Sequence, residues 1–361
     1  MTVSGHWDVV GIGTGPLTLL RAAECAAEGA RVLLLDRGEA IGGAWRSARF
    51  ADIANVELGV HLIENRPGVI EALAAASGVR FIDETPGLNF GLWRGRRIPI
   101  GAARFALHGL VGAKAALRGD PAKARRMAIS ARRALAHRHR PFAYPEGGMR
   151  AVLCALRDRI EAAGGGMELG RSVDAVVFGA GAARLHLEDR TLTADRVLFA
   201  SRAHAPVRDP GAPPLVTRPS RTHCAVLAFR GPSPPFAYVE VFGDRSVKRL
   251  RDVGRIVAPS GTGDLRVVCV QLRTAPEVPP GRLAEHIATH VVRLGLADPG
   301  IRPVAARHES VAFRTATRAS LGTLARHVSP RLEIVHSTDL AEDLMTRLTR
   351  EGLSRGSSGS P

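Results

Sequence analysis

Three glycines near the start of the chain are spaced to form a turn that leaves room for a phosphate group. Gly11, Gly13 and Gly15 follow a short apolar run that is typical of a buried strand. Residues 17–28 then have the apolar spacing of a helix and end before another glycine. Glycine lets the backbone approach a phosphate, and the free N–H groups at a helix start attract its negative charge.

An acidic residue stands at the end of the next apolar run. Val32–Leu35 predicts a second strand, and Asp36 follows it directly. A carboxylate at this place accepts a hydrogen bond from a ribose hydroxyl. Pro16 replaces the last glycine of the usual G-x-G-x-x-G pattern, and proline is well tolerated at the first position of a helix. Strand, turn, helix and acid together predict a βαβ unit that binds a dinucleotide. The alternative is a βαβ unit that binds nothing.

Other patterns place further elements around this unit. Apolar spacing predicts a strand over 56–63 and a helix over 68–77. A basic helical region is expected over 102–139, interrupted at Pro121. We expect a three-stranded meander over 172–200, an irregular proline-rich segment over 205–235, a strand over 236–242 and a last strand over 332–335.

The 361 residues are long enough for two domains. We predict an α/β fold with a discontinuous Rossmann-type dinucleotide-binding domain and a mixed α+β substrate domain. The first is expected over 1–68, 142–205 and 322–351, and the second over 69–141 and 206–321. The Gly/Ser-rich residues 352–361 are expected to be disordered. No run of about 18 apolar residues predicts a membrane span. The four cysteines are scattered without a C-x-x-C pair, which indicates free thiols, no metal site and a cytoplasmic protein.

The formal net charge of +16 is concentrated in one part of the chain. Residues 94–140 contain many basic side chains and a single acid, Asp120. Such a region attracts an anionic substrate, an acidic carrier protein or a membrane surface, and the alternative is a solvated helical face. We expect no nucleic-acid partner, because nearly all positive residues are Arg and no basic-aromatic pattern is found.

Several motifs taken together resemble the two-domain FAD-binding oxidoreductases, which include amine oxidases, phytoene-type desaturases and UDP-galactopyranose mutase. The motifs are the G-x-G-x-G turn, Asp36-Arg37, Gly42-Gly43 and the sequence YPEGGM at 144–149 with its following helix and meander. The resemblance implies FAD as cofactor, held by Gly11, Gly13, Gly15, Asp36, Arg37, Gly42, Gly43, Trp45, Val173 and Asp339.

The resemblance also suggests residues near the reacting centre. The segment VELGVHLI at 56–63 is similar to one in the mutase subgroup, which implies that His61 lies beside the flavin ring. A structural role for this histidine is the alternative. Tyr238, on the strand expected over 236–242, could contact the substrate or be a plain sheet residue.

The implied activity is that of a FAD-dependent oxidase or desaturase. It would act on a small molecule, such as a secondary metabolite, by hydride transfer to flavin N5. No second nucleotide fingerprint for NADPH is found, so oxygen or another acceptor would reoxidise the flavin. One alternative is a mutase-like enzyme that uses flavin without net redox change. Another is a flavoprotein-like partner or scaffold without catalysis.

Overall fold

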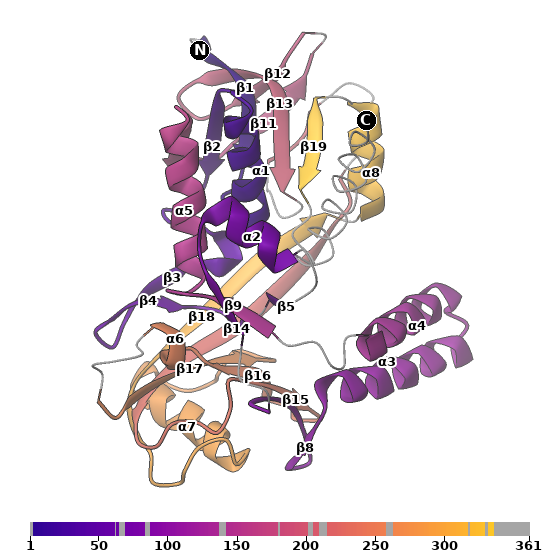
Figure 1. Cartoon of the computed structure of the whole chain (residues 1–361). Helices are drawn as coiled ribbons and strands as arrows, with labels where there is room; N and C mark the ends of the chain where they lie inside the picture. Colours follow the sequence, from indigo (N-terminus) through magenta and orange to yellow (C-terminus); the bar gives the residue numbers. More distant parts are fainter. Residues whose placement is uncertain are drawn as a thin grey trace, which may run out of the picture.

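Two seven-stranded sheets organise the chain in the computed structural model (Figure 1). The structure describes residues 3–61, 63–64, 69–83, 87–136, 142–179, 181–200, 205–208, 215–257, 263–316, 318–328 and 331–335. Asp339 and the tail at 352–361 therefore lie outside the described residues. The α/β fold with a Rossmann-type sheet that the sequence predicts is confirmed.

The first sheet contains the predicted βαβ unit. β1 (Val3–Ile12) pairs in parallel with β2 (Val32–Asp36) on one side and with β13 (Thr191–Ala200) on the other. α1 (Pro16–Ala27) connects β1 to β2. The strand order is β10-β2-β1-β13-β12-β11, and β19 pairs with the second half of β13. The outer strands are β10 (Gly166–Leu169), β11 (Ala175–Phe178), β12 (Ala183–His186) and β19 (Leu332–Val335).

Helices cover both faces of the first sheet. α1, α2 (Val69–Ser77) and α5 (Met149–Ala162) contribute to the core on one face. α8 (Arg318–His327) packs Leu321 and Leu324 into the core on the other face. A sheet buried on both sides needs apolar residues in succession rather than alternation. All four residues of Val32–Leu35 are buried accordingly.

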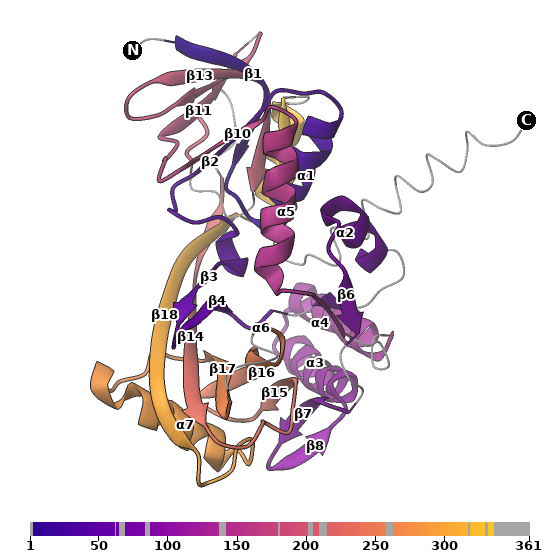
Figure 2. The ribbon, with the colours of Figure 1, turned by 60° about the vertical axis from the view of Figure 1, so that its left-hand side comes forward.

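The second sheet is mostly antiparallel and has the order β18-β14-β17-β16-β15-β7-β8. α7 (Leu283–Arg293), preceded by the 3₁₀ turn η2 (Pro280–Arg282), packs Ile287 and Val291 onto one face. β14 and β18 extend from this sheet to the first one (Figure 2). The strands are β18 (Arg302–Ala316), β14 (Thr217–Arg230), β17 (Leu265–Leu272), β16 (Val247–Asp252), β15 (Tyr238–Phe242), β7 (Asn89–Trp93) and β8 (Arg96–Ile98).

Small elements lie between and beside the two sheets. A 3₁₀ turn, η1 (Gly43–Trp45), leads into the hairpin of β3 (Ser47–Phe50) and β4 (Ile53–Glu57). A three-stranded sheet is formed by β5 (Ile63–Glu64), β9 (Phe142–Pro145) and β6 (Phe81–Asp83). The short α6 (Gly254–Val257) follows β16. The basic region forms the helical hairpin of α3 (Ile100–Leu117) and α4 (Pro121–Ala136), as predicted.

Two expectations about elements were wrong. The strand expected over 56–63 ends at Glu57, because the chain turns at Gly59 before β5 begins. The segment 205–235 is not irregular throughout, since it contains β14, a strand of 14 residues. Buried apolar residues such as Val226 and Phe229 hold this strand between β17 and β18 despite Pro219.

Candidate active site

The glycine turn after β1 packs closely against the first sheet. A Cβ atom at Gly11 would lie 2.3 Å from Leu34 Cδ2, so the close contact between turn and sheet requires glycine. Gly13 has a φ of +98°, which side-chain-bearing residues rarely adopt, and its N–H donates to the carbonyl of Leu35 at 2.7 Å. Gly15 faces open space and caps α1, with Pro16 as the first helical residue.

A second pair of glycines closes over this turn. The N–H of Gly42 donates to the carbonyl of Thr14 at 2.9 Å, and a Cβ at Gly42 would lie 2.4 Å from Leu153 Cδ1. A Cβ at Gly43 would lie 3.6 Å from the Cα of Gly15. Gly43 thus faces the backbone of Gly15, and neither carries a side chain, beside a helix start with no acidic residue in its first turn. This glycine cradle is suited to the phosphates of a dinucleotide.

Asp36 is held in a fixed orientation at the end of β2. Its Oδ2 accepts hydrogen bonds from the N–H and the hydroxyl of Thr14, at 2.7 and 2.6 Å. Its Oδ1 accepts one from the N–H of Gly38 at 2.8 Å. A carboxylate can accept about four hydrogen bonds, so this half-buried group keeps room for a ribose hydroxyl. The residues present therefore fit FAD or another dinucleotide.

The other predicted cofactor residues lie at several places around Asp36. Arg37 is exposed. Val173 is buried in the core of the first sheet, shortly after Arg171, whose N–H donates to the carbonyl of Asp36 at 2.8 Å. Trp45 is buried in η1. The role of each in cofactor binding stays a prediction.

A buried carboxylate organises the region between the glycine cradle and the second sheet. Glu57, at the end of β4, is fully buried. It accepts hydrogen bonds from the hydroxyl of Tyr144 and, at 3.0 Å, from the N–H of Met149. Met149 is the first residue of α5, so a negative charge here is stabilised by the positive end of the helix.

His61 is attached to this carboxylate. Its Nδ1 lies 3.3 Å from Glu57 Oε2, and its ring centre lies 6.4 Å from that of Trp45. A Cβ at Gly59 would lie 2.6 Å from His61 Cε1, so the ring occupies the space that glycine leaves free. The structure thus brings together the two predicted residues Trp45 and His61. A Glu57–His61 bond of this kind fixes which ring nitrogen carries the proton.

Arg251 connects this cluster to the second sheet. The guanidinium of this fully buried residue donates to the carbonyl of His61 at 2.9 Å. Its Cζ lies 4.0 Å from the centre of the Tyr144 ring, a cation–π contact. Arg251 belongs to β16 and stands directly opposite Tyr238 on β15, so both side chains are on one face of the sheet.

Tyr238 lies in a polar row on this face of the second sheet. It is fully buried, packs edge-on against Phe142, and its hydroxyl lies 3.5 Å from Glu240 Oε2. Burial and the nearby charge of Glu240 raise the pKa of the Tyr238 hydroxyl. Arg249, opposite Glu240, donates to the side chain of Gln271 on β17. These groups could contact polar parts of a substrate, whereas the opposite face is occupied by α7.

Sequence reasoning missed four residues of this arrangement. They are Thr14, Glu57, Tyr144 as a hydrogen-bond donor, and Arg251. The detectable signal was Glu57, an acidic residue within the mostly apolar stretch 56–63. A charge in a buried segment needs a specific partner. Two partners of Glu57, Tyr144 of β9 and Met149 of α5, are 87 and 92 residues away in the chain, so the sequence alone does not identify them.

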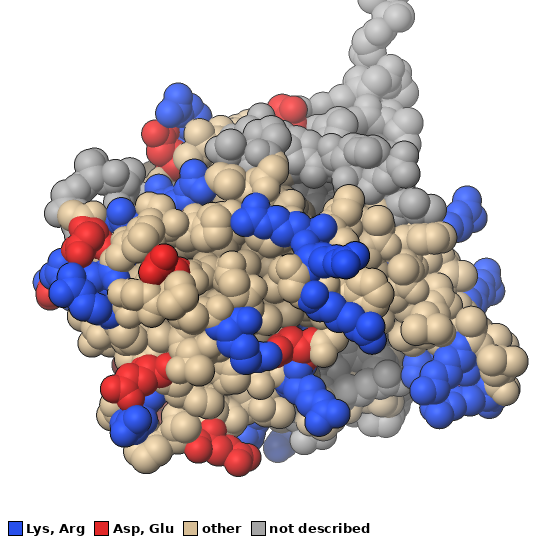
Figure 3. All heavy atoms as spheres, turned by 90° about the horizontal axis from the view of Figure 1, so that it is seen from below, with Lys and Arg blue, Asp and Glu red and all other residues tan. Residues whose placement is uncertain are grey.

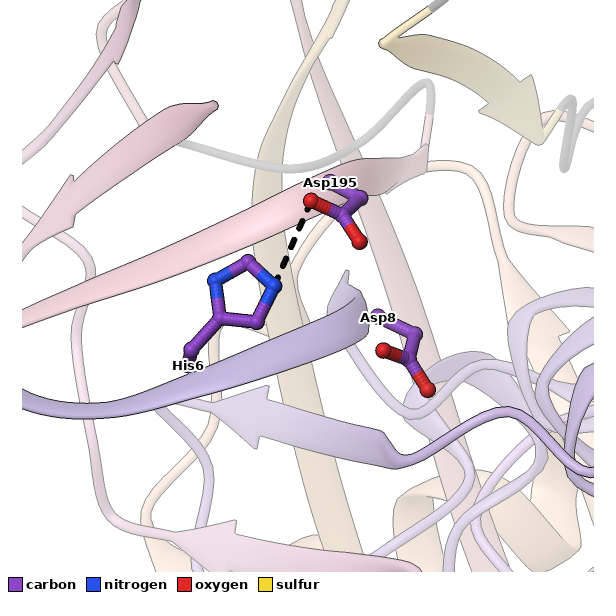
Figure 4. Close-up of side chains that lie close together, drawn as sticks. All are labelled: His6, Asp8 and Asp195. Carbon is purple, nitrogen blue, oxygen red and sulfur yellow. Dashed lines mark ion pairs between the residues drawn. The ribbon is translucent and has the colours of Figure 1, made fainter. Parts of the chain in front are cut away.

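A separate group of possible metal ligands lies on β1 and β13 (Figure 4). The ligand atoms of His6, Asp8 and Asp195 are within 4.8 Å of one another. His6 and Asp195 form an exposed ion pair at 3.3 Å, and Asp8 accepts a hydrogen bond from the N–H of Arg31. The group sits near the beginning of β1, whereas ligands of such sheets bind at the opposite, carboxyl ends of the strands. We assign no metal to it.

Comparisons with known proteins support this fold. Residues 12–75 match the family model of the NAD(P)-binding Rossmann-like domain. No curated protein matches the sequence. An oxidoreductase from Methanosarcina mazei has a similar structure, with a TM-score of 0.63 and 17% identity over 96% of this chain and 100% of that chain.

Two solved oxidases have comparable similarity. A proposed protoporphyrinogen oxidase from an Exiguobacterium species has a TM-score of 0.64 and 15% identity over 98% of this chain and 100% of that chain. Putrescine oxidase, solved with putrescine, has a TM-score of 0.62 and 14% identity over 97% of this chain and 99% of that chain. The expected resemblance to two-domain oxidoreductases of the amine oxidase type is therefore confirmed at the level of the fold.

Proposed function

We propose that this chain is a FAD-dependent oxidoreductase, an oxidase or desaturase of a small-molecule substrate. The observation that carries the proposal is the glycine cradle of Gly15 and Gly43 at the start of α1, with Asp36 fixed at the end of β2. Gly11, Gly13 and Gly42 shape this cradle. When bound, FAD supplies an acceptor for a hydride and its two electrons.

The chain's own residues would bind, orient and enclose the reactants. The phosphates would bind at the start of α1 and in the glycine cradle. The Asp36 carboxylate would accept a hydrogen bond from a ribose hydroxyl. Trp45 and His61 would lie between the cradle and the second sheet, Trp45 as the apolar and His61 as the polar side chain of this boundary. Glu240 and Arg249, the half-buried members of the polar row, would orient the substrate from the opposite side, with the fully buried Tyr238 behind them. The oxidase fold of the structural neighbours supports this arrangement.

The mutase alternative receives less support from the structure. A nucleotide-sugar diphosphate is generally held by arginines and tyrosines, and this chain has only two tyrosines. Tyr144 and Tyr238 are both fully buried, with hydroxyls directed at Glu57 and Glu240. Neither hydroxyl is presented to a diphosphate.

A visible spectrum of the purified protein tests the cofactor. We expect the absorption bands of flavin, and several-fold lower FAD content in Asp36→Ala, because the ribose contact is lost. Asp195→Ala is the matched control, since this exposed aspartate lies in the same sheet away from the cradle. A colourless protein that takes up no added FAD would exclude the enzyme proposed here.

Oxygen consumption separates the two flavin activities. An oxidase consumes oxygen in proportion to product. Turnover that requires prior flavin reduction and consumes no oxygen would support the mutase-like alternative instead.

A further inference from the structure

The outer face of α3 is apolar and exposed. Phe105 is 41% exposed, Leu110 is 69% exposed and Leu117 is 90% exposed. Ala106 and Ala113, also exposed, complete a stripe at positions 106, 110, 113 and 117. This spacing places the four residues on one side of a helix. A contiguous exposed apolar patch on a protein surface commonly marks an interaction site.

The hairpin that carries this stripe projects from the body of the protein. α3 packs on α4, and Gly112 allows a close approach, because a Cβ there would lie 3.1 Å from the Cβ of Met127. Arg104 joins the start of α3 to Glu240 on β15 at 2.8 Å. Figure 1 shows both helices extending sideways from the second sheet.

The hairpin that carries the apolar stripe is strongly basic. Residues 100–136 contain eight Lys or Arg and one acid, Asp120. The Asp120 carboxylate accepts a hydrogen bond from the N–H of Lys123 at 2.9 Å, so it caps the start of α4. Within the described part of the chain, no carboxylate forms an ion pair with these exposed cations: Lys114, Arg118, Lys123, Arg125, Arg126 and Arg132. Figure 3 shows blue and tan but no red spheres at the right, where the hairpin lies.

We propose that the α3–α4 hairpin docks on the surface of an anionic phospholipid bilayer. A helix with a continuous apolar face and flanking cations lies in the headgroup region, with its apolar side chains at the acyl boundary. Leu110 and Leu117 would enter this boundary, and the cations of both helices would contact the lipid phosphates. No described helix is long and apolar enough to cross a membrane, so the contact is with one surface.

A lipid surface fits these observations better than a second copy of the chain. Two copies joined through this hairpin would bring two strongly positive regions together, and like charges repel. An anionic bilayer offers phosphate groups to the cations and an acyl boundary to the apolar stripe. This inference does not depend on the cofactor, because no residue of the glycine cradle belongs to the hairpin.

Vesicle co-sedimentation of the full chain tests the inference. We expect the protein to sediment with vesicles of phosphatidylglycerol and phosphatidylcholine, and at least ten-fold less with phosphatidylcholine alone. The double variant Leu110→Glu/Leu117→Glu should lose at least ten-fold in partitioning. The matched control, Val216→Glu/Val304→Glu, changes two exposed apolar residues outside the hairpin and should bind like the wild type.

Three results would overturn the inference. The wild type could stay in the supernatant with the anionic vesicles. The hairpin variant could bind as well as the wild type, which would mean adsorption by charge elsewhere on the surface. The hairpin variant could also abolish self-association in sedimentation velocity without changing vesicle binding, which would identify a second copy as the partner.

Discussion

At the scale of single residues, the second sheet contains a buried carboxylate with incomplete hydrogen bonding among the described residues. Asp252, at the end of β16, is 1% exposed. Its Oδ1 accepts a hydrogen bond from the N–H of Arg255 at 3.3 Å, and among the described residues its Oδ2 has no hydrogen-bond partner. Burial raises the pKa of the Asp252 carboxyl to about 6 from 3.8.

Replacing this acid by its amide should stabilise the protein at neutral pH. An acid with a raised pKa binds its proton more tightly in the folded state, so stability falls as pH rises from about 4 to about 6. Asp252→Asn removes this loss while keeping an acceptor for Arg255. We expect a gain of roughly 1–3 kcal/mol in unfolding free energy at pH 7, and almost none near pH 4.

Urea denaturation at both pH values measures this effect. Asp264→Asn is the control, because that carboxylate is exposed and paired with Arg230. The prediction fails if Asp252→Asn gives the same change at pH 4 as at pH 7, since the effect would then not come from ionisation.

Single residues also show how far sequence reasoning reaches at the candidate site. Gly13 and Asp36 were predictable because turn and acid lie within one short βαβ unit. Thr14 was not, since its bonds to Asp36 depend on the register of β1 against β2. The same holds for Arg251, whose partner His61 is 190 residues away in the chain.

At the scale of elements, Gly42 and Gly43 have separable tasks. Gly42 has a φ of +105° and packs against Leu153 of α5, whereas Gly43 has a φ of +53° and faces Gly15. Gly42→Ala should lower the unfolding free energy by about 2–4 kcal/mol through backbone strain and overpacking. Gly43→Ala should cost only about 1 kcal/mol but reduce FAD retention, because its methyl group enters the cradle.

Thermal unfolding and bound flavin, measured on both variants, distinguish these roles. Equal destabilisation with equal flavin content would show that the two glycines act together on packing alone.

The elements that were predictable share one property, which is local patterning. The βαβ unit and the helices of the α3–α4 hairpin are each encoded within a short window. β14 was not predicted, because Pro219 and the prolines around it mark a loop while its apolar residues depend on neighbours in β17 and β18. The turn at Gly59 likewise depends on packing rather than on local propensity, because a side chain there would collide with the ring of His61.

At the scale of the whole molecule, the small elements between the two sheets pack on the second sheet through an apolar core and specific polar contacts. β14 and β18 run between the two sheets, and Arg46, after η1, pairs with Glu309 of β18 at 2.9 Å. The fully buried Arg251 belongs to the second sheet and donates to the carbonyl of His61. The sequence predicted two units, but it could not indicate that a buried arginine links the second sheet to the segment after β4.

Loss of this arginine should weaken the whole molecule rather than one sheet. Arg251→Met keeps much of the side-chain volume but removes the bond to the His61 carbonyl and the contact with Tyr144. We expect the unfolding free energy to fall by about 2–4 kcal/mol, because a part-buried carbonyl loses its donor and a fully buried side chain loses its contacts. Arg249→Met is the matched control on the same strand, since Arg249 is half-buried and bonds to Gln271 within its own sheet. It should cost at most half as much in urea denaturation. Equal losses in the two variants would show that the contacts of Arg251 outside the second sheet add no more to stability than the bond of Arg249 within it.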